Sequence, residues 1–208
     1  MLYIVNFLEL FTAVVALLTF WKYRSSNERY FLIFLWYTFL VEVIGALMGD
    51  VFYIDNSSVY NTFTITSMLF YFYWYHSILK KAVFKRVTIA FTIIFLLVAA
   101  LNFVFENWNT YHKYSFFCGA FFILILTIFH FQQLLNSNEV LIVKYKLSFW
   151  ISTALLLFYM GMIPLFFLIE YTGIRGLSYR IILISLNLML YGCYNIGFLW
   201  TKKEYNRF

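Results

Sequence analysis

Apolar residues are arranged along the chain in seven long stretches that are separated by short polar connections. The stretches cover residues 2–20, 30–49, 59–79, 87–105, 114–135, 147–169 and 180–200. Each is close to the roughly 20 residues that a helix needs to cross a hydrocarbon core about 30 Å thick. The stretches are apolar on most sides and do not alternate strictly, which argues against a transmembrane barrel. The pattern therefore predicts an all-α integral membrane protein with seven transmembrane helices in one domain, residues 1–208.

The composition agrees with this class. Of the 208 residues, 64% are hydrophobic and 12% are charged, which is far from the balance of an ordinary soluble domain. The connections are too short to hold a soluble catalytic or nucleotide-binding domain. Whatever the chain does, we expect it to do with helices and short loops inside a lipid bilayer.

Lys and Arg are distributed unevenly among the connections. Only Lys113, Arg175 and Arg180 follow the even-numbered stretches, whereas the other twelve of the 15 basic residues follow the odd-numbered ones. These twelve are Lys22, Arg24, Arg29, Lys80, Lys81, Lys85, Arg86, Lys144, Lys146, Lys202, Lys203 and Arg207. Because cytoplasmic loops carry the excess of Lys and Arg, we predict the N-terminus outside and the C-terminus in the cytoplasm. The net charge of +6 then serves as an anchor to anionic lipid, and no nucleic-acid partner is expected.

Two carboxylates, Glu9 and Glu42, lie inside the apolar stretches, where a charge is costly. Each is about eight residues from the outer end of its helix, which places both about 10 to 12 Å below the outer surface at a rise of 1.5 Å per residue. The residues at helical spacing around both acids are mostly small or polar, as is typical of helix contacts in membranes. We therefore expect the two acids to share one layer in the outer half of the bundle.

Further polar side chains reach the same layer from other helices. Asn187 and Tyr191 lie one turn apart in the last stretch, Tyr159 lies in the sixth, and Asn61 lies nearer the outer surface in the third. Amide and phenol groups can offset the cost of a buried acid by donating hydrogen bonds to it. The predicted ligand- or ion-binding residues are Glu9, Glu42, Asn61, Tyr159, Asn187 and Tyr191.

The sixth stretch contains the only proline of the chain, in the segment Gly161-Met162-Ile163-Pro164. Pro164 cannot donate to the carbonyl of Met160, and its ring tends to kink the helix. The freed carbonyl must find another partner at membrane depth. We therefore predict a hinge at Gly161 and Pro164.

Several roles are open for the acidic layer. Glu9 and Glu42 could be hydrogen-bonded residues that fix the register of the helices. They could also line a pocket that is open to the outside and binds a small cationic or polar ligand, protons or a metal ion, since intramembrane acids often mark functional sites. Contact with a second chain in an oligomer is the third alternative.

His76 and His130 lie toward the cytoplasmic ends of their helices. Neighbouring side chains such as Tyr73 and Gln133 favour the interpretation of both histidines as ordinary interfacial groups over a proton relay or a metal site. The hydrolase signatures G-x-S-x-G and H-E-x-x-H and a glycine-rich phosphate loop are all missing from the sequence. The sequence therefore favours a non-enzymatic protein without a cofactor.

The orientation of the helices permits a parallel internal repeat in which helices one to three and five to seven are joined by helix four. Residues 68–81 of the third helix can be aligned with residues 189–203 of the seventh, since both segments begin with Met-Leu and end in a lysine pair. Apolar helices followed by lysine pairs also match by chance. This 3+1+3 repeat is therefore an option that the sequence supports only thinly.

A set of short motifs spreads over nearly the whole chain. The motifs are Phe34-Leu35-Trp36-Tyr37 before Glu42, Tyr60-Asn61, Phe149-Trp150-Ile151-Ser152, residues 156–161 with Pro164, Leu186-Asn187 with Tyr191, and Gly197-Phe198-Leu199-Trp200. Together they resemble a group of small seven-helix inner-membrane proteins of Bacteroidota. The resemblance implies a bacterial inner membrane and frequent encoding beside sensor histidine kinases. It brings no catalytic residues with it.

Three functions follow from these observations. The leading hypothesis is a sensor or signalling accessory that binds a small ligand or ion from the outside and acts on a histidine kinase or another membrane partner. The first alternative is a small proton- or cation-coupled transporter or channel. The second alternative is a structural subunit of a larger membrane complex, and a homo-oligomer is compatible with all three.

Overall fold

The computed structural model describes residues 3–107, 109–137, 140–174 and 176–206. These residues form seven α-helices and contain no β-strand. The helices are α1 (Tyr3–Leu18), α2 (Tyr30–Ala46), α3 (Ser57–Ile78), α4 (Ala82–Phe105), α5 (Lys113–Leu135), α6 (Leu147–Thr172) and α7 (Leu177–Trp200). Short helical turns adjoin them at η1 (Phe20–Lys22), η2 (Asn27–Arg29), η3 (Leu47–Val51), η4 (Val140–Tyr145) and η5 (Lys203–Tyr205). Residue 2 of the first predicted helix, Arg175 and Arg207 lie outside the described residues.

The prediction of an all-α chain with a helix in each apolar stretch is confirmed, but several helices are longer than the stretches. α4 begins at Ala82 rather than at residue 87, and α7 begins at Leu177 rather than at residue 180. Hydropathy marks where a helix becomes apolar, whereas its hydrogen bonds begin earlier, in the polar residues before that point. α6 continues to Thr172 and ends at Gly173, whose positive φ of 64° gives the left-handed conformation typical of a helix C-terminus.

Among the described residues, five helical segments are long and apolar enough to cross a membrane: α2 together with η2 and η3 (Asn27–Val51), and α4, α5, α6 and α7. The described part of α1 has 16 residues, about 24 Å of helix, which is shorter than the hydrocarbon core. α3 has 22 residues, but it carries polar side chains along one face. Several apolar helices make the chain a multi-pass membrane protein, and seven spans with a defined orientation stay a prediction.

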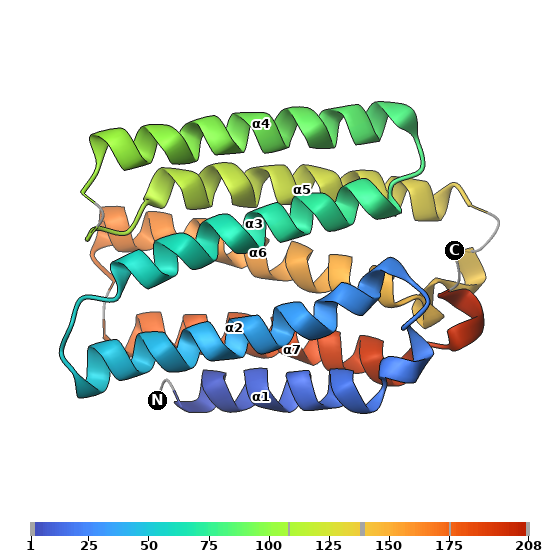
Figure 1. Cartoon of the computed structure of the whole chain (residues 1–208), viewed down its shortest axis with the longest axis horizontal. Coiled ribbons are helices and arrows are strands. Elements are labelled where there is room, and N and C mark those ends of the chain that lie inside the picture. Colours follow the sequence, from blue (N-terminus) through green and yellow to red (C-terminus); the bar gives the residue numbers. More distant parts are fainter. Residues whose placement is uncertain (1–2, 108, 138–139, 175, 207–208) are drawn as a thin grey trace.

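The contacts between helices form a closed ring of six, and α4 lies outside it; Figure 1 shows α4 along one edge of the bundle. Around the ring, α1 packs on α2, α2 on α3, α3 on α5, α5 on α6, α6 on α7, and α7 on α1 again, while α4 packs on α3 and α5. Successive helices run in opposite directions, so the chain ends lie at opposite ends of the bundle (Figure 1). We call the end that holds the N-terminus the outer end and the other the inner end, following the predicted orientation.

The ring has the neighbour relations that a 3+1+3 repeat requires. α3 lies beside α5 just as α7 lies beside α1, and α4 connects the two groups of three from outside. The order of helices around the ring is therefore compatible with the 3+1+3 repeat, which stays a prediction.

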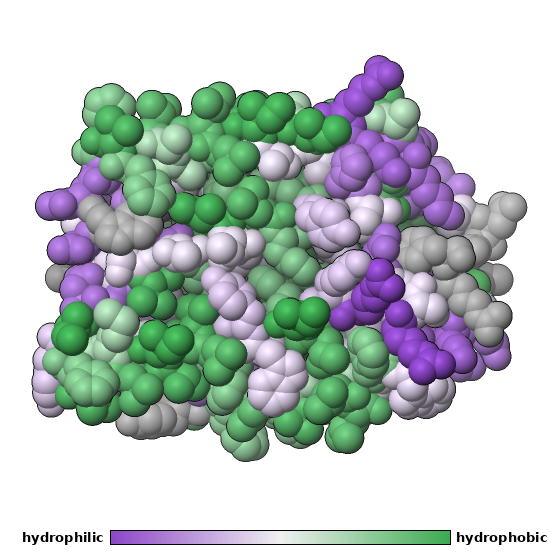
Figure 2. Space-filling model, in the orientation of Figure 1, coloured by the Kyte–Doolittle hydropathy of each residue, from purple (hydrophilic) through white to green (hydrophobic). Residues whose placement is uncertain are grey.

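Apolar and polar side chains are distributed over the surface as expected for a helix bundle in lipid. Hydrophobic side chains cover the middle of the visible face, and hydrophilic ones gather toward its two ends (Figure 2). Large side chains such as Ile33, Val104 and Phe105 are 69%, 75% and 80% exposed. An apolar surface of this extent is typical of a protein embedded in a membrane.

Candidate functional site

A cavity of about 440 Å³ lies inside the ring. All six ring helices contribute to its wall, and it extends from Asn56, Tyr111 and Tyr179 at the outer end to Tyr71 and Tyr194 in the middle of the bundle. Its size falls in the range of ordinary small-molecule sites. The cavity therefore occupies the outer half of the bundle and reaches the outer connections.

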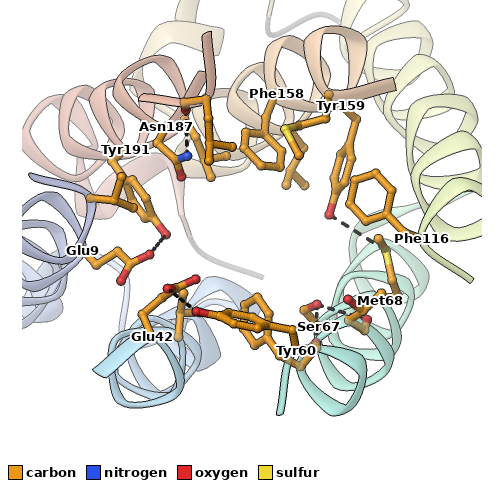
Figure 3. A pocket seen from close by; sticks show the side chains of 18 of the residues that line it. Glu9, Glu42, Tyr60, Ser67, Met68, Phe116, Phe158, Tyr159, Asn187 and Tyr191 are labelled. Carbon is orange, nitrogen blue, oxygen red and sulfur yellow. Dashed lines mark hydrogen bonds between the residues drawn. The ribbon is translucent and has the colours of Figure 1, made fainter. Parts of the chain in front are cut away.

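Glu9 projects from α1 into this cavity (Figure 3). Only 3% of the residue is exposed, and the Tyr191 hydroxyl of α7 donates a hydrogen bond of 2.9 Å to its Oε1. Its Oε2 is buried without a hydrogen-bond partner. One turn further along α7, the Asn195 amide donates a hydrogen bond of 2.9 Å to Thr12 Oγ1, which is a second hydrogen bond between α7 and α1. One oxygen of the Glu9 carboxylate is thus hydrogen-bonded to the protein, and the other is available to a molecule or ion in the cavity.

Glu42 enters the cavity from α2, and Tyr60 of α3 donates a hydrogen bond of 3.1 Å to its Oε2. Gly45 makes this contact feasible, because a Cβ at that position would lie 2.6 Å from the Tyr60 hydroxyl oxygen. The π-turn Leu47–Val51 follows α2 directly, and the Asn56 amide donates to the Gly45 carbonyl at 2.9 Å. The glycine and the following turn thus bring α3 close enough to hold Glu42.

Glu9 and Glu42 point into the same space (Figure 3). The described residues that line the cavity include no Lys, Arg or His. Two carboxylates in a mostly apolar cavity are costly unless something neutralises them. The occupants that suit this space are therefore protons, a cation or the cationic group of a larger molecule.

The rest of the wall is largely aromatic. Phe116, Phe158 and Tyr159 face the hollow opposite the acids, and the Tyr159 hydroxyl contacts the sulfur of Met68 at 3.8 Å (Figure 3). Aromatic faces attract organic cations through their quadrupoles. Among the described residues, no three His, Cys, Asp or Glu side chains lie together as a metal site would require. The lining therefore suits an organic cation better than a tightly bound transition metal.

Comparisons with protein-family models, curated proteins and solved structures find no match. The resemblance to inner-membrane proteins of Bacteroidota therefore stays a prediction. The geometry of the cavity is what indicates its chemistry.

Five of the six residues predicted to bind a ligand line the cavity, namely Glu9, Glu42, Tyr159, Asn187 and Tyr191. Tyr191 holds Glu9 directly, whereas the Asn187 amide donates to the Leu183 carbonyl of its own helix at 2.9 Å. Asn187 is therefore a wall residue whose amide hydrogen bond stays within α7.

Asn61, the sixth residue predicted to bind a ligand, is not among the described residues that line the cavity. Its side-chain oxygen accepts a hydrogen bond from the backbone N–H of His112 at 2.9 Å, and its amide donates to the Thr110 carbonyl at 2.8 Å. These contacts fasten the connection between α4 and α5 to α3. The structure thus gives Asn61 a part in holding this connection, and a ligand-binding role for it stays a prediction.

Tyr60 is the residue that the sequence-based prediction missed. Its neighbours on the same face of α3 are Thr64, Ser67 and Tyr71, at intervals of four, three and four, and all four line the cavity. This spacing keeps residues on one side of a helix. The repeated polar positions were the signal that would have identified this face.

Two further predictions concern α6 and α5. Gly161 of the predicted hinge lies where α6 meets α7, and a Cβ there would clash with the Leu186 side chain. Pro164 lies inside a helix that continues from Leu147 to Thr172, so the hinge stays a prediction. His130 is 2% exposed, and its Nδ1 lies 2.7 Å from Ser152 Oγ. The sequence did not identify this serine partner, and the interfacial position of His130 stays a prediction.

Proposed function

We propose that the protein is a membrane sensor or signalling accessory that binds a small organic cation from the outer side. The observation that carries the proposal is the pair Glu9 and Glu42, which project into one cavity whose wall, in the described part of the chain, contains no basic side chain. Glu9 Oε2 is buried and without a partner, and a cationic ligand would supply the missing hydrogen bond. A charge-assisted hydrogen bond of this kind is stronger than a neutral one.

The proposed ligand has one ammonium-type group and a compact apolar body. The ammonium group would lie between the two carboxylates, and the body would lie against Phe116, Phe158 and Tyr159. A cavity of about 440 Å³ accommodates a molecule of this size. Alkali cations and protons are the smaller alternatives for the same position.

The signal in this proposal is a movement between helices that the ligand would draw together. Glu9 belongs to α1 and Glu42 to α2, while their donors belong to α7 and α3. A ligand shared by both acids favours the arrangement in which these four helices are closest, and so shifts the population toward it. The basic inner connections would pass this change to a histidine kinase or another partner in a bacterial inner membrane.

A proton- or cation-coupled transporter is the second candidate. Two groups of three helices facing each other across a central acidic cavity favour it, because transporters often place their site between repeats. It differs from the sensor in one measurable respect: a transporter moves its ligand across the membrane, and a sensor does not.

The test is thermal unfolding of the protein in mild detergent, followed by tryptophan fluorescence. The probes are benzylamine, which has one ammonium group and a compact apolar body, tetramethylammonium, which has no N–H to donate, and sodium chloride. We expect at least one organic cation to raise the midpoint of unfolding in proportion to the logarithm of its concentration. Glu9→Gln and Glu42→Gln should each weaken the effect about 10- to 100-fold, as the loss of a charge-assisted hydrogen bond implies. Glu106→Gln is the control, because this acid lies at the outer end outside the cavity wall.

Two results would contradict the proposal. One is an unchanged midpoint with every probe. The other is a Glu42→Gln protein that no longer folds in mild detergent, which would assign the acid a structural role. Mass spectrometry of proteins that co-purify with the tagged chain tests the partner: a near-stoichiometric histidine kinase supports the sensor, and envelope machinery supports a structural subunit.

A further inference from the structure

A second cavity, of about 370 Å³, lies at the inner end of the bundle. It is lined by polar and charged side chains from several elements, including Glu28 of η2, His130 of α5, and Lys80 and Lys146 from the connections. Glu28 and His130 are 3% and 2% exposed. The bundle therefore has a titratable cavity at its inner end in addition to the acidic cavity of its outer half.

Buried hydroxyl groups extend from this inner cavity toward the outer one. Ser152 Oγ lies 2.7 Å from His130 Nδ1 and accepts a hydrogen bond of 3.3 Å from the Tyr75 hydroxyl. The same Tyr75 hydroxyl lies 2.6 Å from Thr127 Oγ1. Three helices, α3, α5 and α6, thus place four polar side chains in continuous contact inside the core.

The outer cavity ends at a similar group. The hydroxyls of Tyr71 and Tyr194 lie 3.5 Å apart, and both residues line the outer cavity. Tyr71 is one turn of α3 away from Tyr75, which is about 6 Å of rise. Among the described side chains, no direct hydrogen bond joins the two groups of hydroxyls, so a continuous path needs a water between the Tyr71 and Tyr75 hydroxyls.

Packing alone does not account for these side chains. Phenylalanine, alanine or valine would fill the same volume without a buried polar atom, which costs free energy unless it is hydrogen-bonded. Each member of the chain can both donate and accept a hydrogen bond. That property is what proton transfer along a row of groups requires.

We propose that Tyr71, Tyr194, Tyr75, Ser152 and His130 form a path that carries protons between the outer and inner cavities. Thr127 holds the Tyr75 hydroxyl in position. The path does not depend on the identity of the cation in the outer site, so it goes beyond the proposed sensor function. It gives the chain a second activity, passive proton conduction across the bundle.

The transfer conserves atoms and charge. A proton from the outer cavity binds the first hydroxyl, which releases its own proton to the next, and His130 accepts a proton on Nδ1 and releases one from Nε2. The inner cavity receives this proton. Rotation of the hydroxyls, together with a flip of the His130 ring and proton exchange that returns it to the Nε2–H tautomer, restores the starting arrangement. One positive charge moves inward for each event, so sustained flux needs an opposing movement of another ion.

The groups around His130 come from every element that packs against it. Trp74 and Tyr75 of α3 lie against its ring, Ser152 of α6 lies beside Nδ1, and the inner cavity adds Glu28, Lys80, Lys146 and Tyr205. Glu28 is the only carboxylate among the described residues that line this cavity. It is the natural proton acceptor on the inner side.

The experiment is proton flux into proteoliposomes that contain a trapped pH-sensitive dye, driven by a potassium gradient with valinomycin. We expect wild-type vesicles to acidify faster than empty ones. Tyr75→Phe and Ser152→Ala should each lower the protein-dependent rate at least tenfold. Tyr23→Phe is the matched control, because Tyr23 is also fully buried and donates to the Ala16 carbonyl at 2.7 Å, but it is not part of the path.

The proposal is overturned if wild-type vesicles acidify no faster than empty ones, or if Tyr75→Phe conducts like Tyr23→Phe. Unfolding midpoints of both variants show that each is folded before it is reconstituted. Cation binding is measured separately on the same proteins. Lost flux with retained cation binding in Tyr75→Phe supports the path, whereas absent binding with normal flux contradicts the sensor proposal alone.

Discussion

The outer and inner halves of the bundle use the same kinds of residue in different ways. The outer half encloses about 440 Å³ and leaves one carboxylate oxygen of Glu9 without a partner. The inner half is packed with fully buried aromatic side chains such as Trp74, Tyr75 and Phe198. The inner half also has a cavity, of about 370 Å³, at its end, but its layer of buried aromatic side chains lies deeper in the bundle. We therefore expect this aromatic layer to contribute most to stability, while the outer half keeps the larger cavity and the open Glu9 oxygen that binding needs.

The largest difference between the two halves is expected when glycines at the contact between α6 and α7 are replaced by alanine. A Cβ on Gly197 in the inner half would lie 2.6 Å from Trp150 Cβ, an atom next to the backbone that cannot move independently. We expect Gly197→Ala to lower the free energy of unfolding by about 3 kcal/mol, the upper range for overpacking. Gly161→Ala in the outer half should cost about 1 kcal/mol, because the end of the Leu186 side chain can rotate away.

Gly192→Ala is the control for both variants, since no atom lies within 4 Å of a Cβ at that position of α7. Unfolding by urea or heat in one detergent gives the three values. Equal losses for Gly197→Ala and Gly161→Ala would show that the two halves are packed alike.

The second largest loss of stability is expected where the Asn206 side chain joins the inner ends of α6 and α7. Asn206 accepts a hydrogen bond from the Leu147 N–H at 3.0 Å and donates to Thr201 Oγ1 at 2.6 Å, and it is 6% exposed. Asn206→Ala should therefore lower the free energy of unfolding by about 2 kcal/mol, because it leaves a buried N–H at the start of α6 unpaired. Asn136→Ala, at an exposed helix end, should change it by less than about 0.5 kcal/mol.

A smaller effect is expected for the donors to the two outer acids. Tyr191→Phe removes the one hydrogen bond to buried Glu9 and should cost about 1 kcal/mol. Tyr60→Phe should cost less, because Glu42 is only partly buried and water can replace the lost donor. A double-mutant cycle that combines Tyr191→Phe with Glu9→Gln measures the interaction energy between these two side chains directly. Loss of more than about 3 kcal/mol in Tyr191→Phe would mean that the outer half also determines stability.

The smallest effect is expected at the outer surface. Lys113 and Glu170 form an ion pair of 2.7 Å between α5 and α6, with both side chains more than half exposed. Water and salt screen such a pair, so Glu170→Gln should leave the unfolding midpoint unchanged. A clear decrease that disappears at high salt would show that this pair does hold the outer ends together.

Hydropathy predicted the helices of this chain well, because seven apolar stretches leave few other arrangements in lipid. It did not predict the ring or the outside position of α4, since apolar helices look alike whichever neighbour they contact. The shared depth of Glu9 and Glu42 followed from rise per residue. The choice between Tyr60 and Asn61 did not, because adjacent residues lie about 100° apart on a helix and only the packed structure shows which one faces inward.

The bond between Tyr191 and Glu9 joins residues that are 182 positions apart in the chain, and this separation has a consequence for biogenesis. At roughly 5 to 20 residues per second, the ribosome delivers α7 about 10 to 40 s after α1. During that interval the Glu9 side chain has no tyrosine donor, and the ring cannot close. We expect α1 to stay beside the insertion machinery or a helper protein until the last helix arrives.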